Sequence, residues 1–415
     1  MLEFSDAPYQ FFEPQPSSPV IWLGRKVNQH FIVPRKNHLI QELRVEGALD
    51  EINEARTNGD RLVFVINHPS HSDPQVISEV HRQLGIPSSF MAAYDVFLRS
   101  KLSCWVMQKC GHFSIDREGS DRKAMSTAID MIKGGDFALN IYPEGNVYLT
   151  NDRVTPFLDG TAFIALKAQK DLKDTARVKV IPISLKFTHL TAPKETVTER
   201  MIQLARDCGY QYPKDVKPLD AVFGLGNHIV SNYLRTHGYK EEMATGPEGL
   251  YETLTGFTND LVAKLEGGLS LEASPETDLV DRIRKIRSKI HQLRTDEKAE
   301  PHPEIDGIAE KAILVLRIHG YLTPYLSDKP TIDRYDETVE RIAEDYYSKA
   351  MPRTGPRRCY AQIHSPLDVQ EYMDNAGGKL RDAVASLTCD SEKAVQKGID
   401  DINEKNDTSG AWMVN

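Results

Sequence analysis

Two residues five positions apart, His68 and Asp73, have the types and spacing needed for acid–base chemistry. A neutral imidazole can take a proton from a hydroxyl group, and a carboxylate on its second nitrogen fixes the tautomer and stabilises the imidazolium that forms. The pair would therefore act as a general base. The alternative is that both side chains only satisfy loop and helix-cap hydrogen bonds, and His71 could compete for the same carboxylate.

The flanking sequence predicts a strand before His68 and a helix from Asp73. Residues 63–66 are four consecutive apolar residues, three of them β-branched, which is typical of a short buried strand. Asp73 followed by Pro74 is typical of a helix start, because the carboxylate can cap free N–H groups and the fixed φ of proline suits the first turn. The four-residue loop between them would let the carboxylate reach back to the imidazole.

Three cations close to another predicted strand end form a candidate anion site. Phe113 and Ile115 alternate as in a half-buried strand, Arg117 stands at its end, and Arg122 and Lys123 follow. Guanidinium groups bind phosphate or carboxylate with two parallel hydrogen bonds. The alternative for such a cluster is a charged rim that water solvates.

A glutamate lies between a proline and a glycine, Pro143 and Gly145, directly after the predicted strand 137–141. A carboxylate on this rigid and sharply turned backbone could hold a substrate hydroxyl or a cation. Glu144 could equally be a simple turn residue.

Strands and helices alternate through the first half of the chain, which predicts an α/β domain with a central sheet. The most apolar strand, 178–187, contains Pro182 and is therefore expected at an edge or a bulge. Residues 38–57 predict a single helix. Ligands of α/β sheets gather beyond the strand ends, where all the candidate residues above fall.

Five sequence blocks between about residues 60 and 187 resemble, in order, those of the glycerolipid acyltransferase family, whose best-known members acylate lysophosphatidic acid or glycerol 3-phosphate. Asn67 to Asp73, with Ser70 inside it, matches the N-H-x-S-x-x-D block. Gly111 to Arg117 follows the G-x-x-F-I-x-R block, with Ser114 at the aromatic position and Phe113 one place early. Residues 142–145 look like the F-P-E-G block, 157–165 follow F-x-x-G-x-x-x-x-A, and 180–183, with Pro182, look like the V-P-V strand.

The resemblance implies a mixed sheet flanked by helices and an acyl-transfer reaction. His68 would deprotonate the acceptor hydroxyl, Asp73 would orient His68, and the alkoxide would attack an acyl thioester directly. Neither an acyl-enzyme nor a metal would be needed. The donor would be acyl-CoA or an acyl carrier protein acting as a co-substrate, so no other cofactor is expected.

The resemblance also assigns the acceptor side, with two departures. Arg117 would hold an acceptor phosphate, and Glu144 and Gly145 would help bind its polar end. The family's P-E-G block usually continues T-R-S, where this chain has Asn146 to Tyr148, and many relatives carry a lysine where this chain has Ala93 to Asp95. A less charged acceptor, or a phosphate grip by Arg122 and Lys123, would follow.

We predict four parts of the chain. Residues 1–37 are a leader with an amphipathic segment, 38–194 with 357–390 are the α/β domain, 195–356 are a helical insertion, and 391–415 are a flexible tail. The insertion rests on helical spacing from residue 196 onward, with no comparable strand signal before 358–364. A plain C-terminal helical domain is the competing layout.

Two basic segments suggest surfaces for partners. Residues 20–33 mix apolar side chains with Arg25 and Lys26 and could lie on an anionic membrane. A helix near 276–294 carries six cations and could face a membrane or an acidic carrier protein: Arg282, Arg284, Lys285, Arg287, Lys289 and Arg294. A solvated helix face is the alternative for both.

Composition narrows the function classes. The net charge of −9, from 51 basic and 60 acidic residues, argues against nucleic acid as the main partner. Five scattered cysteines predict reduced thiols in a cytoplasmic protein and no zinc site. No apolar run is long enough to span a bilayer, so we expect a cytoplasmic protein that could contact the inner face of a membrane.

Two other functions remain open at this point. The same base could activate water, which would make the protein an acyl-thioester hydrolase. The fold could also serve as a non-catalytic lipid-binding or protein-binding scaffold, although such a protein has no need of the His68 and Asp73 pair.

Overall fold

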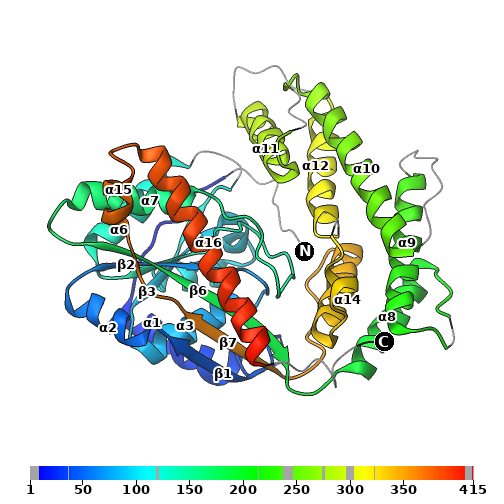
Figure 1. Cartoon of the computed structure of the whole chain (residues 1–415), viewed down its shortest axis with the longest axis horizontal. Helices are drawn as coiled ribbons and strands as arrows, with labels where there is room; N and C mark the ends of the chain where they lie inside the picture. The colour runs from blue at the N-terminus through cyan, green and yellow to red at the C-terminus, as the bar shows by residue number, and fades with distance from the viewer. Residues whose placement is uncertain are drawn as a thin grey trace. The chain divides into compact units, whose positions relative to one another are not determined.

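The computed structural model describes residues 9–35, 37–117, 121–213, 215–236, 246–272, 276–295, 303–321, 323–406 and 414. These residues form two compact units, an α/β unit within 3–191 and 355–407 and a helical unit within 192–354 (Figure 1). The helical unit therefore interrupts the sequence of the α/β unit.

The α/β unit is built on an eight-stranded mixed sheet, which confirms the predicted fold class. Its strands are β1 (Ile40–Gly47), β2 (Arg61–Ile66), β3 (Ser88–Ala93), β4 (Phe113–Ile115), β5 (Ala138–Ile141), β6 (Val178–His189), β7 (Arg357–Ile363) and β8 (Leu367–Asp368). Their order is β1-β7-β6-β2-β5-β3-β4, with β8 also beside β6.

Strands β6, β2, β5, β3 and β4 run parallel to their neighbours in this order, whereas β7 and β8 are antiparallel to β6. The carboxyl ends of parallel strands meet at one edge of a sheet. The segments that follow β2, β3, β4 and β5 therefore emerge at the same edge.

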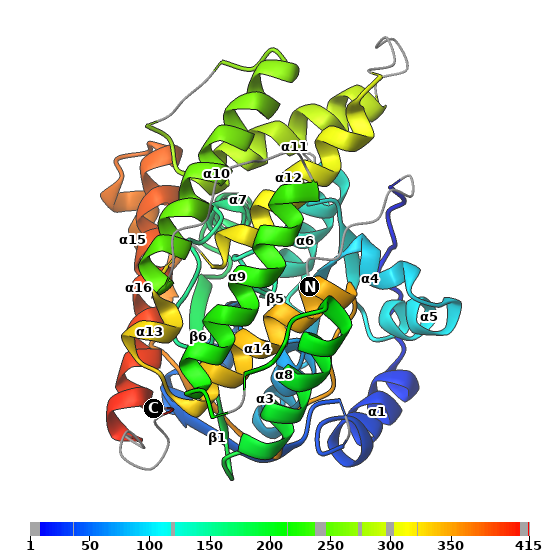
Figure 2. The same ribbon diagram turned by 90° about the vertical axis from the view of Figure 1, so that its right-hand side faces the viewer.

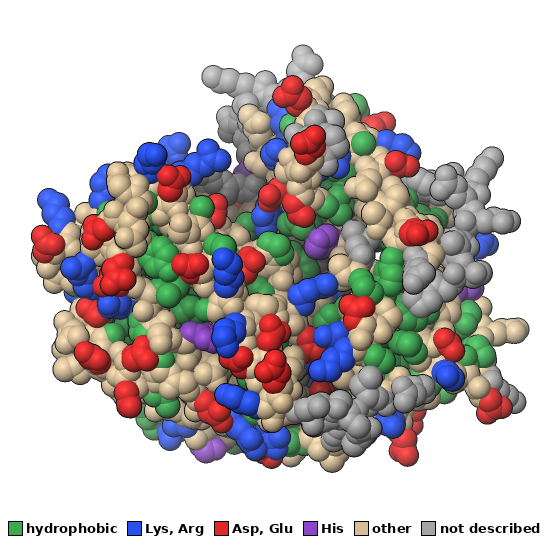
Figure 3. Space-filling model, viewed as in Figure 1, with side chains coloured by type: hydrophobic (Ala, Val, Ile, Leu, Met, Phe, Trp, Pro, Cys, Tyr) green, Lys and Arg blue, Asp and Glu red, His purple; other side chains and the backbone are tan. Residues whose placement is uncertain are grey.

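The helices of the α/β unit are α1 (Ser18–Val27), the π-helix η1 (Asn28–Ile32), α2 (Leu49–Thr57), α3 (Asp73–Leu84), α4 (Tyr94–Leu98), α5 (Lys101–Lys109), α6 (Arg122–Gly134), α7 (Gly160–Leu172), α15 (Val369–Asn375) and α16 (Leu380–Lys405). The chain before α1 is bonded to the end of α5, through the amide N–H groups of Gln15 and Ser17 (Figure 2). On the face seen in Figure 3, acidic and basic side chains are interspersed.

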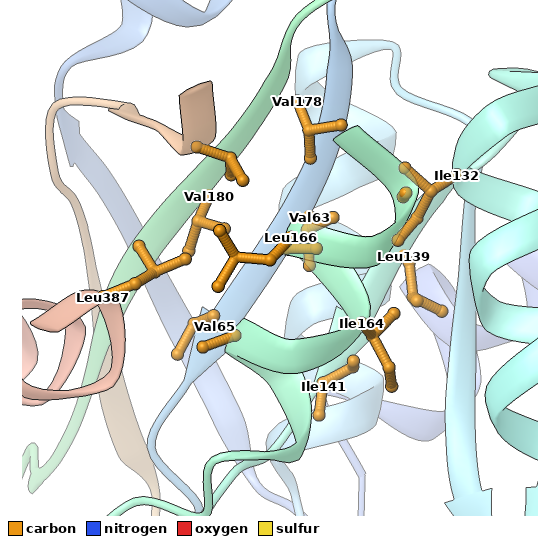
Figure 4. Packing of buried hydrophobic residues seen from close by; sticks show 14 of the residues in the cluster. Val63, Val65, Ile132, Leu139, Ile141, Ile164, Leu166, Val178, Val180 and Leu387 are labelled. Carbon is orange, nitrogen blue, oxygen red and sulfur yellow. The ribbon is translucent and has the colours of Figure 1, made fainter. Parts of the chain in front are cut away.

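The core lies on both faces of the sheet. Val63 and Val65 of β2 pack on one face with side chains of α6, α7, α15 and α16 (Figure 4). Phe64 and Ile66 pack on the opposite face with side chains of α2 and α3. A strand buried on both faces reads as a continuous apolar run, which is why residues 63–66 predicted it correctly.

The single helix predicted over 38–57 is wrong, because the structure has strand β1 followed by helix α2. β1 pairs with β7, with Ile40 beside Arg357, and a partner so distant in sequence leaves no local pattern. Gly47 separates the two elements at a φ of +111°, and a Cβ there would lie 2.0 Å from the carbonyl oxygen of Ile363.

The prediction that Pro182 marks an edge or a bulge is wrong, since β6 lies inside the sheet between β7 and β2. Pro182 falls between two ladders, because β6 pairs with β7 from Ile183 onward and with β8 up to Val180. Its carbonyl oxygen accepts from the N–H of His364 at 3.0 Å. Proline has no backbone N–H, and on the side of β6 that faces β7 and β8 Pro182 lies between the two ladders, so no ladder bond is lost there.

The flexible tail predicted for 391–415 is wrong for residues 391–405, which belong to α16. Ser391, Val395, Ile399 and Ile402 of this stretch are buried. The helix carries an apolar face at helical spacing that packs on the sheet, so it is held by the core. Residues 407–413 and 415 of the predicted tail, and residues 1–8 of the predicted leader, lie outside the described residues.

The described residues of the helical unit form seven helices, as the helical spacing from residue 196 onward indicates. They are α8 (Lys194–Cys208), α9 (Pro218–Thr236), α10 (Gly246–Gly268), α11 (Leu279–Thr295), α12 (Ile305–His319), α13 (Tyr325–Asp328) and α14 (Ile332–Tyr347). Among the described residues of both units, none of the helices is long and apolar enough to cross a membrane.

The basic run on α11 is not a uniform solvated face. Arg282 is buried, and its guanidinium donates to both carboxylate oxygens of Glu266, at 2.9 and 2.7 Å. Arg284 pairs with Asp281, and Arg294 donates to Asp306. Helical spacing alone could not separate the cation that stabilises the unit from those on its surface.

Candidate active site

The loop between β2 and α3 begins with a buried asparagine that continues the sheet. The side-chain amide of Asn67 donates to the carbonyl of Leu185 at 2.9 Å, and its oxygen accepts from the N–H of the same residue at 2.7 Å. These two bonds to β6 fix the point at which the chain leaves the sheet. His68 is therefore presented from a defined backbone position.

The side chains of His68 and Asp73 lie in contact in the structure. Nδ1 of His68 lies 2.7 Å from Oδ2 of Asp73, and the N–H of Ser70 donates to the same oxygen at 3.0 Å. The Asp73 side chain is fully buried, whereas that of His68 keeps 16% of its exposure. With Nδ1 engaged by the carboxylate, Nε2 is the ring atom that can exchange a proton with a substrate.

The expected capping role of Asp73 is wrong. Ser72 is the N-cap of α3, no side chain caps it, and Asp73 is the first residue of the helix. The carboxylate instead turns back to the loop. Burial raises the pKa of Asp73, while the hydrogen bonds from His68 and Ser70 act to lower it.

A tyrosine ring covers the imidazole. The rings of Tyr142 and His68 stack with centroids 4.2 Å apart and planes inclined by 19°. Burial raises the pKa of Tyr142, and the nearby Asp73 carboxylate raises it further. The Tyr142 hydroxyl and Oδ1 of Asp73 are both buried polar atoms without a hydrogen-bond partner among the described residues.

Both carboxylate oxygens of Glu144 accept hydrogen bonds from backbone N–H groups. Its side chain is buried, with Oε1 accepting from the N–H of His68 at 2.6 Å and Oε2 from the N–H of Thr155 at 2.9 Å. Burial raises the pKa of Glu144 to about 7, although both backbone hydrogen bonds act to lower it. Glu144 therefore positions the backbone of His68, and a role for Glu144 and Gly145 in binding the acceptor stays a prediction.

The residues on either side of Glu144 build the turn that aims it. The N–H of Gly145 donates to the carbonyl of Tyr142 at 3.1 Å, and the carbonyl of Pro143 accepts from Leu158 at 2.9 Å. Gly145 has a φ of +78°, which glycine adopts without strain. Gly111 occupies a similar position before β4, with a φ of +86°.

Arg117 lies at the same edge of the sheet, beside this turn. Its guanidinium donates to the carbonyl of Gly145 at 3.0 Å and to Oδ1 of Asn146 at 2.7 Å. It also pairs with Asp95 at 2.8 Å. The structure therefore brings Arg117 to the Glu144 turn, as the sequence predicted, and adds an anion that the sequence reasoning had not paired with it.

The other two cations of the predicted anion site, Arg122 and Lys123, lie on the first turn of α6. Both side chains are exposed. Nζ of Lys123 pairs with Glu13 at 3.0 Å and lies 4.7 Å from the ring centre of Phe11. A role for Arg122 and Lys123 in acceptor binding stays a prediction.

Part of the sequence matches the model of a known protein family. Residues 48–186 match the family model described as Acyltransferase. These residues therefore resemble an acyltransferase domain.

Two curated relatives have names that agree with the family. The glycerol-3-phosphate acyltransferase of Pseudoalteromonas atlantica is 21% identical over 290 residues, covering 63% of this chain and 35% of the relative. The 1-acyl-sn-glycerol-3-phosphate acyltransferase of Streptococcus pneumoniae is 25% identical over 147 residues, covering 35% of this chain and 48% of the relative. The chain thus spans about a third to a half of the length of these relatives.

One residue that supports the loop lies outside the matched segment of the acyltransferase domain and was missed by the sequence reasoning. Arg357, at the start of β7, donates to Oγ of Ser72 at 2.8 Å and to the carbonyl of His38 at 2.8 Å. Its guanidinium lies 4.9 Å from the ring centre of Phe187. Arg357 therefore connects the loop before α3 to strand β7 and to the segment before β1.

No sequence signal pointed to Arg357, because it only preceded a predicted strand. Its contact with the active-site loop depends on the pairing of β7 with β1 and β6, which brings distant segments together. Ser70, which we expected only as part of the first block, is buried and supplies a backbone N–H to Asp73. The α/β unit is thus completed by the part of the chain that follows the helical unit.

Proposed function

We propose that the protein is an O-acyltransferase that moves a fatty acyl group from an acyl thioester to a hydroxyl of a glycerol-phosphate, lysophospholipid or related acceptor. The observation that carries the proposal is the contact between His68 and Asp73, with Nδ1 2.7 Å from a fully buried carboxylate. The names of the two relatives support the same reaction class.

The reaction proceeds through direct attack. Nε2 of His68 takes the proton of the acceptor hydroxyl, and the oxygen attacks the thioester carbonyl to give a tetrahedral intermediate. The carbon–sulfur bond then breaks, the imidazolium returns its proton to the thiolate, and the ester is released with the free thiol. Asp73 stabilises the imidazolium between these steps.

The supports of the loop serve the same chemistry by positioning. Asn67 bonds to the backbone of β6, Glu144 accepts from the N–H of His68, and Arg357 donates to Oγ of Ser72 in the same loop. A base held in this way has little motion to lose when the acceptor binds, which favours the attacking geometry. The donor is acyl-CoA or an acyl carrier protein, and the reaction needs no further cofactor.

The reaction is tested by incubating the purified protein with acyl-CoA and measuring thiol release with and without a panel of hydroxyl acceptors. A transferase releases thiol in proportion to the ester that it forms and depends on the acceptor. Thiol release at the same rate without an acceptor would show instead that the protein is a thioester hydrolase. Acceptor binding without any thiol release would identify a scaffold.

We also propose that the protein works as a peripheral protein on the inner, cytoplasmic face of an anionic membrane. Large apolar side chains are exposed on the short helices α1, η1, α4 and α5. We call these side chains the α1–α5 surface. They include Trp22 (63% exposed), Leu23 (56%), Phe31 (57%), Leu102 (71%) and Trp105 (49%). Such side chains gain free energy when they enter the headgroup region of a bilayer.

The α1–α5 surface also carries basic side chains at its exposed positions. Lys26 and Arg35 lie near the apolar residues of α1 and η1. Arg99 follows α4, and Lys101 is the first residue of α5. Basic residues beside exposed apolar ones favour anionic lipid over a neutral bilayer. The five free cysteines fit the reducing side of that membrane.

A further inference from the structure

A series of three stacked aromatic rings begins at the base. The rings of His68 and Tyr142 stack with centroids 4.2 Å apart and planes inclined by 19°. The ring of Tyr142 stacks in turn with that of Phe90, with centroids 6.2 Å apart and planes inclined by 14°. Phe90 is buried, and Tyr142 packs against the same core cluster. Tyr142 therefore connects the imidazole of His68 to the core of the α/β unit.

The pairing of three strands places these rings. Strand β5 lies between β2 and β3, and Tyr142 directly follows its last residue. The ladder between β2 and β5 runs up to Ile141, so Tyr142 leaves the sheet beside the loop that carries His68. On the other side of β5, the ladder with β3 includes Phe90. The place of the Tyr142 ring thus depends on the sheet itself.

The imidazole of His68 is held in two directions. Asp73 contacts Nδ1 at 2.7 Å, and the ring of Tyr142 lies against the face of the imidazole. The contact with Asp73 alone would let the imidazole tilt, because a hydrogen bond tolerates angles well below linear. A ring stacked on the face opposes that tilt. Nε2 therefore keeps one direction while the acceptor binds, which favours proton transfer.

The stack also acts on the charge that forms during proton transfer. A cation within about 6 Å of the centre of a tyrosine ring is attracted by the negative face of that ring. The imidazolium of His68 would lie 4.2 Å from the centre of Tyr142, whereas the neutral imidazole gains less from the same contact. The hydroxyl of Tyr142 makes no hydrogen bond with the described residues, so these contributions come from the ring.

We propose that Tyr142 is a positioning residue for acyl transfer, whose ring holds the imidazole of His68 against Asp73 and stabilises the imidazolium. This role rests on the proposed function and adds to it a residue that acts through the base. Because Tyr142 contacts the base and not the reacting atoms, its loss should lower kcat and leave KM unchanged. A phenylalanine at this position should serve equally well, because it keeps the ring.

The test compares Tyr142→Leu and Tyr142→Phe with the wild type, using palmitoyl-CoA and the acceptor of the panel above that the wild type acylates fastest. We expect Tyr142→Leu to lower kcat about tenfold at unchanged KM, and Tyr142→Phe to keep kcat within about twofold of the wild type. A wild-type kcat in Tyr142→Leu, a change confined to KM, or an equal loss of kcat in Tyr142→Phe would each overturn the proposal.

A matched control separates this effect from a general loss of packing. Phe97 of α4 is buried and stacks with Phe12, with centroids 5.1 Å apart and planes inclined by 6°. Phe97→Leu removes a stack that does not include His68 and should keep kcat within about twofold of the wild type; a loss as large as that of Tyr142→Leu would overturn the proposal. If Tyr142→Leu does not fold, Phe90→Leu removes the ring that backs Tyr142 and should lower kcat about threefold. An unchanged kcat would then overturn the proposal.

A second readout needs no turnover. The ring current of Tyr142 shifts the magnetic resonance of the carbon-bound protons of the stacked His68 imidazole, which isotope-labelled histidine makes visible and His68→Ala identifies. The resonance should move downfield in Tyr142→Leu and stay in place in Tyr142→Phe. An unmoved resonance in Tyr142→Leu would overturn the positioning role. A wild type that transfers no acyl group would refute the proposed function, and the resonance would then decide the role of Tyr142 by itself.

Discussion

Oδ2 of Asp73 lies 2.7 Å from Nδ1 of His68 while its side chain has no exposure to solvent. A carboxylate in that position acts on the imidazole through a medium of low dielectric constant, where its field is less screened than in water. The imidazolium formed during proton transfer is therefore stabilised at the place where it forms.

Asp73→Asn should leave the fold in place and remove most of the activity. The amide has the shape of the carboxylate but carries no charge, and its N–H₂ group can select the wrong tautomer of His68. We expect the turnover number for acyl transfer to fall by about 10² to 10⁴. Circular dichroism of the variant should match the wild type, and a variant that is folded and fully active would contradict the role given to Asp73.

Asn67→Ala should destabilise the α/β unit. The variant loses both side-chain bonds to Leu185 and leaves a buried N–H and a buried carbonyl without partners. Such losses cost about 2–4 kcal/mol of unfolding free energy. Urea unfolding measures the change, and a difference below about 0.5 kcal/mol would mean that the sheet closes without this asparagine.

The stability of the protein should carry a pH signature of Glu144. Its pKa is raised to about 7 by burial, against 4.5 for an ordinary glutamate, so the folded protein binds more protons than the unfolded chain between those values. Its contribution is therefore greatest below pH 4.5 and is lost as the pH rises to about 7. The loss is on the order of 3 kcal/mol.

Glu144→Gln isolates this contribution because it cannot titrate. The difference in unfolding free energy between wild type and variant should shift against the wild type from pH 5 to pH 8, as followed by urea titrations at several pH values. The subtraction cancels groups that titrate alike in both proteins. A difference that stays constant, or shifts in the opposite direction, would mean that burial does not raise the pKa of the Glu144 carboxyl group.

Substitutions on the α1–α5 surface should weaken membrane binding without affecting folding. Trp22 and Leu102 are 63% and 71% exposed, so replacing either with serine removes little packing. Each should lower the partition onto vesicles containing anionic lipid by about tenfold, as measured by cosedimentation. The control is Ile202→Ser, which replaces a 38% exposed residue on α8; equal binding by all three variants and the wild type would exclude the surface.

The sequence predicted the parts of the site that depend on local pattern. The run from Val63 to Ile66 marked β2, and the polar loop after it ended at α3, as observed. It could not reveal β1 or Arg357, because both depend on β7, which joins the sheet only after the helical unit. The role of Glu144 was also hidden, since its partner is a backbone N–H from a neighbouring strand end.

The same limit explains the ion pair of Arg117. Asp95 and Arg117 are recognisable in the sequence as separate residues after two predicted strands, but only the register of β3 and β4 makes them partners. A cation that looks like a phosphate ligand in a motif can thus form an ion pair with a residue outside that motif. The exposed apolar side chains of the α1–α5 surface were similarly visible as residues but not as one surface.

The most direct test of the account is the rate of acyl transfer by His68→Ala, compared with the wild type and with His71→Ala from the same loop. We expect His68→Ala to lose the proton-transfer step, so that its rate falls by about 10² to 10⁴ or more, while His71→Ala keeps most of its activity. Transfer at the wild-type rate by His68→Ala would contradict the account, because the base would then lie elsewhere.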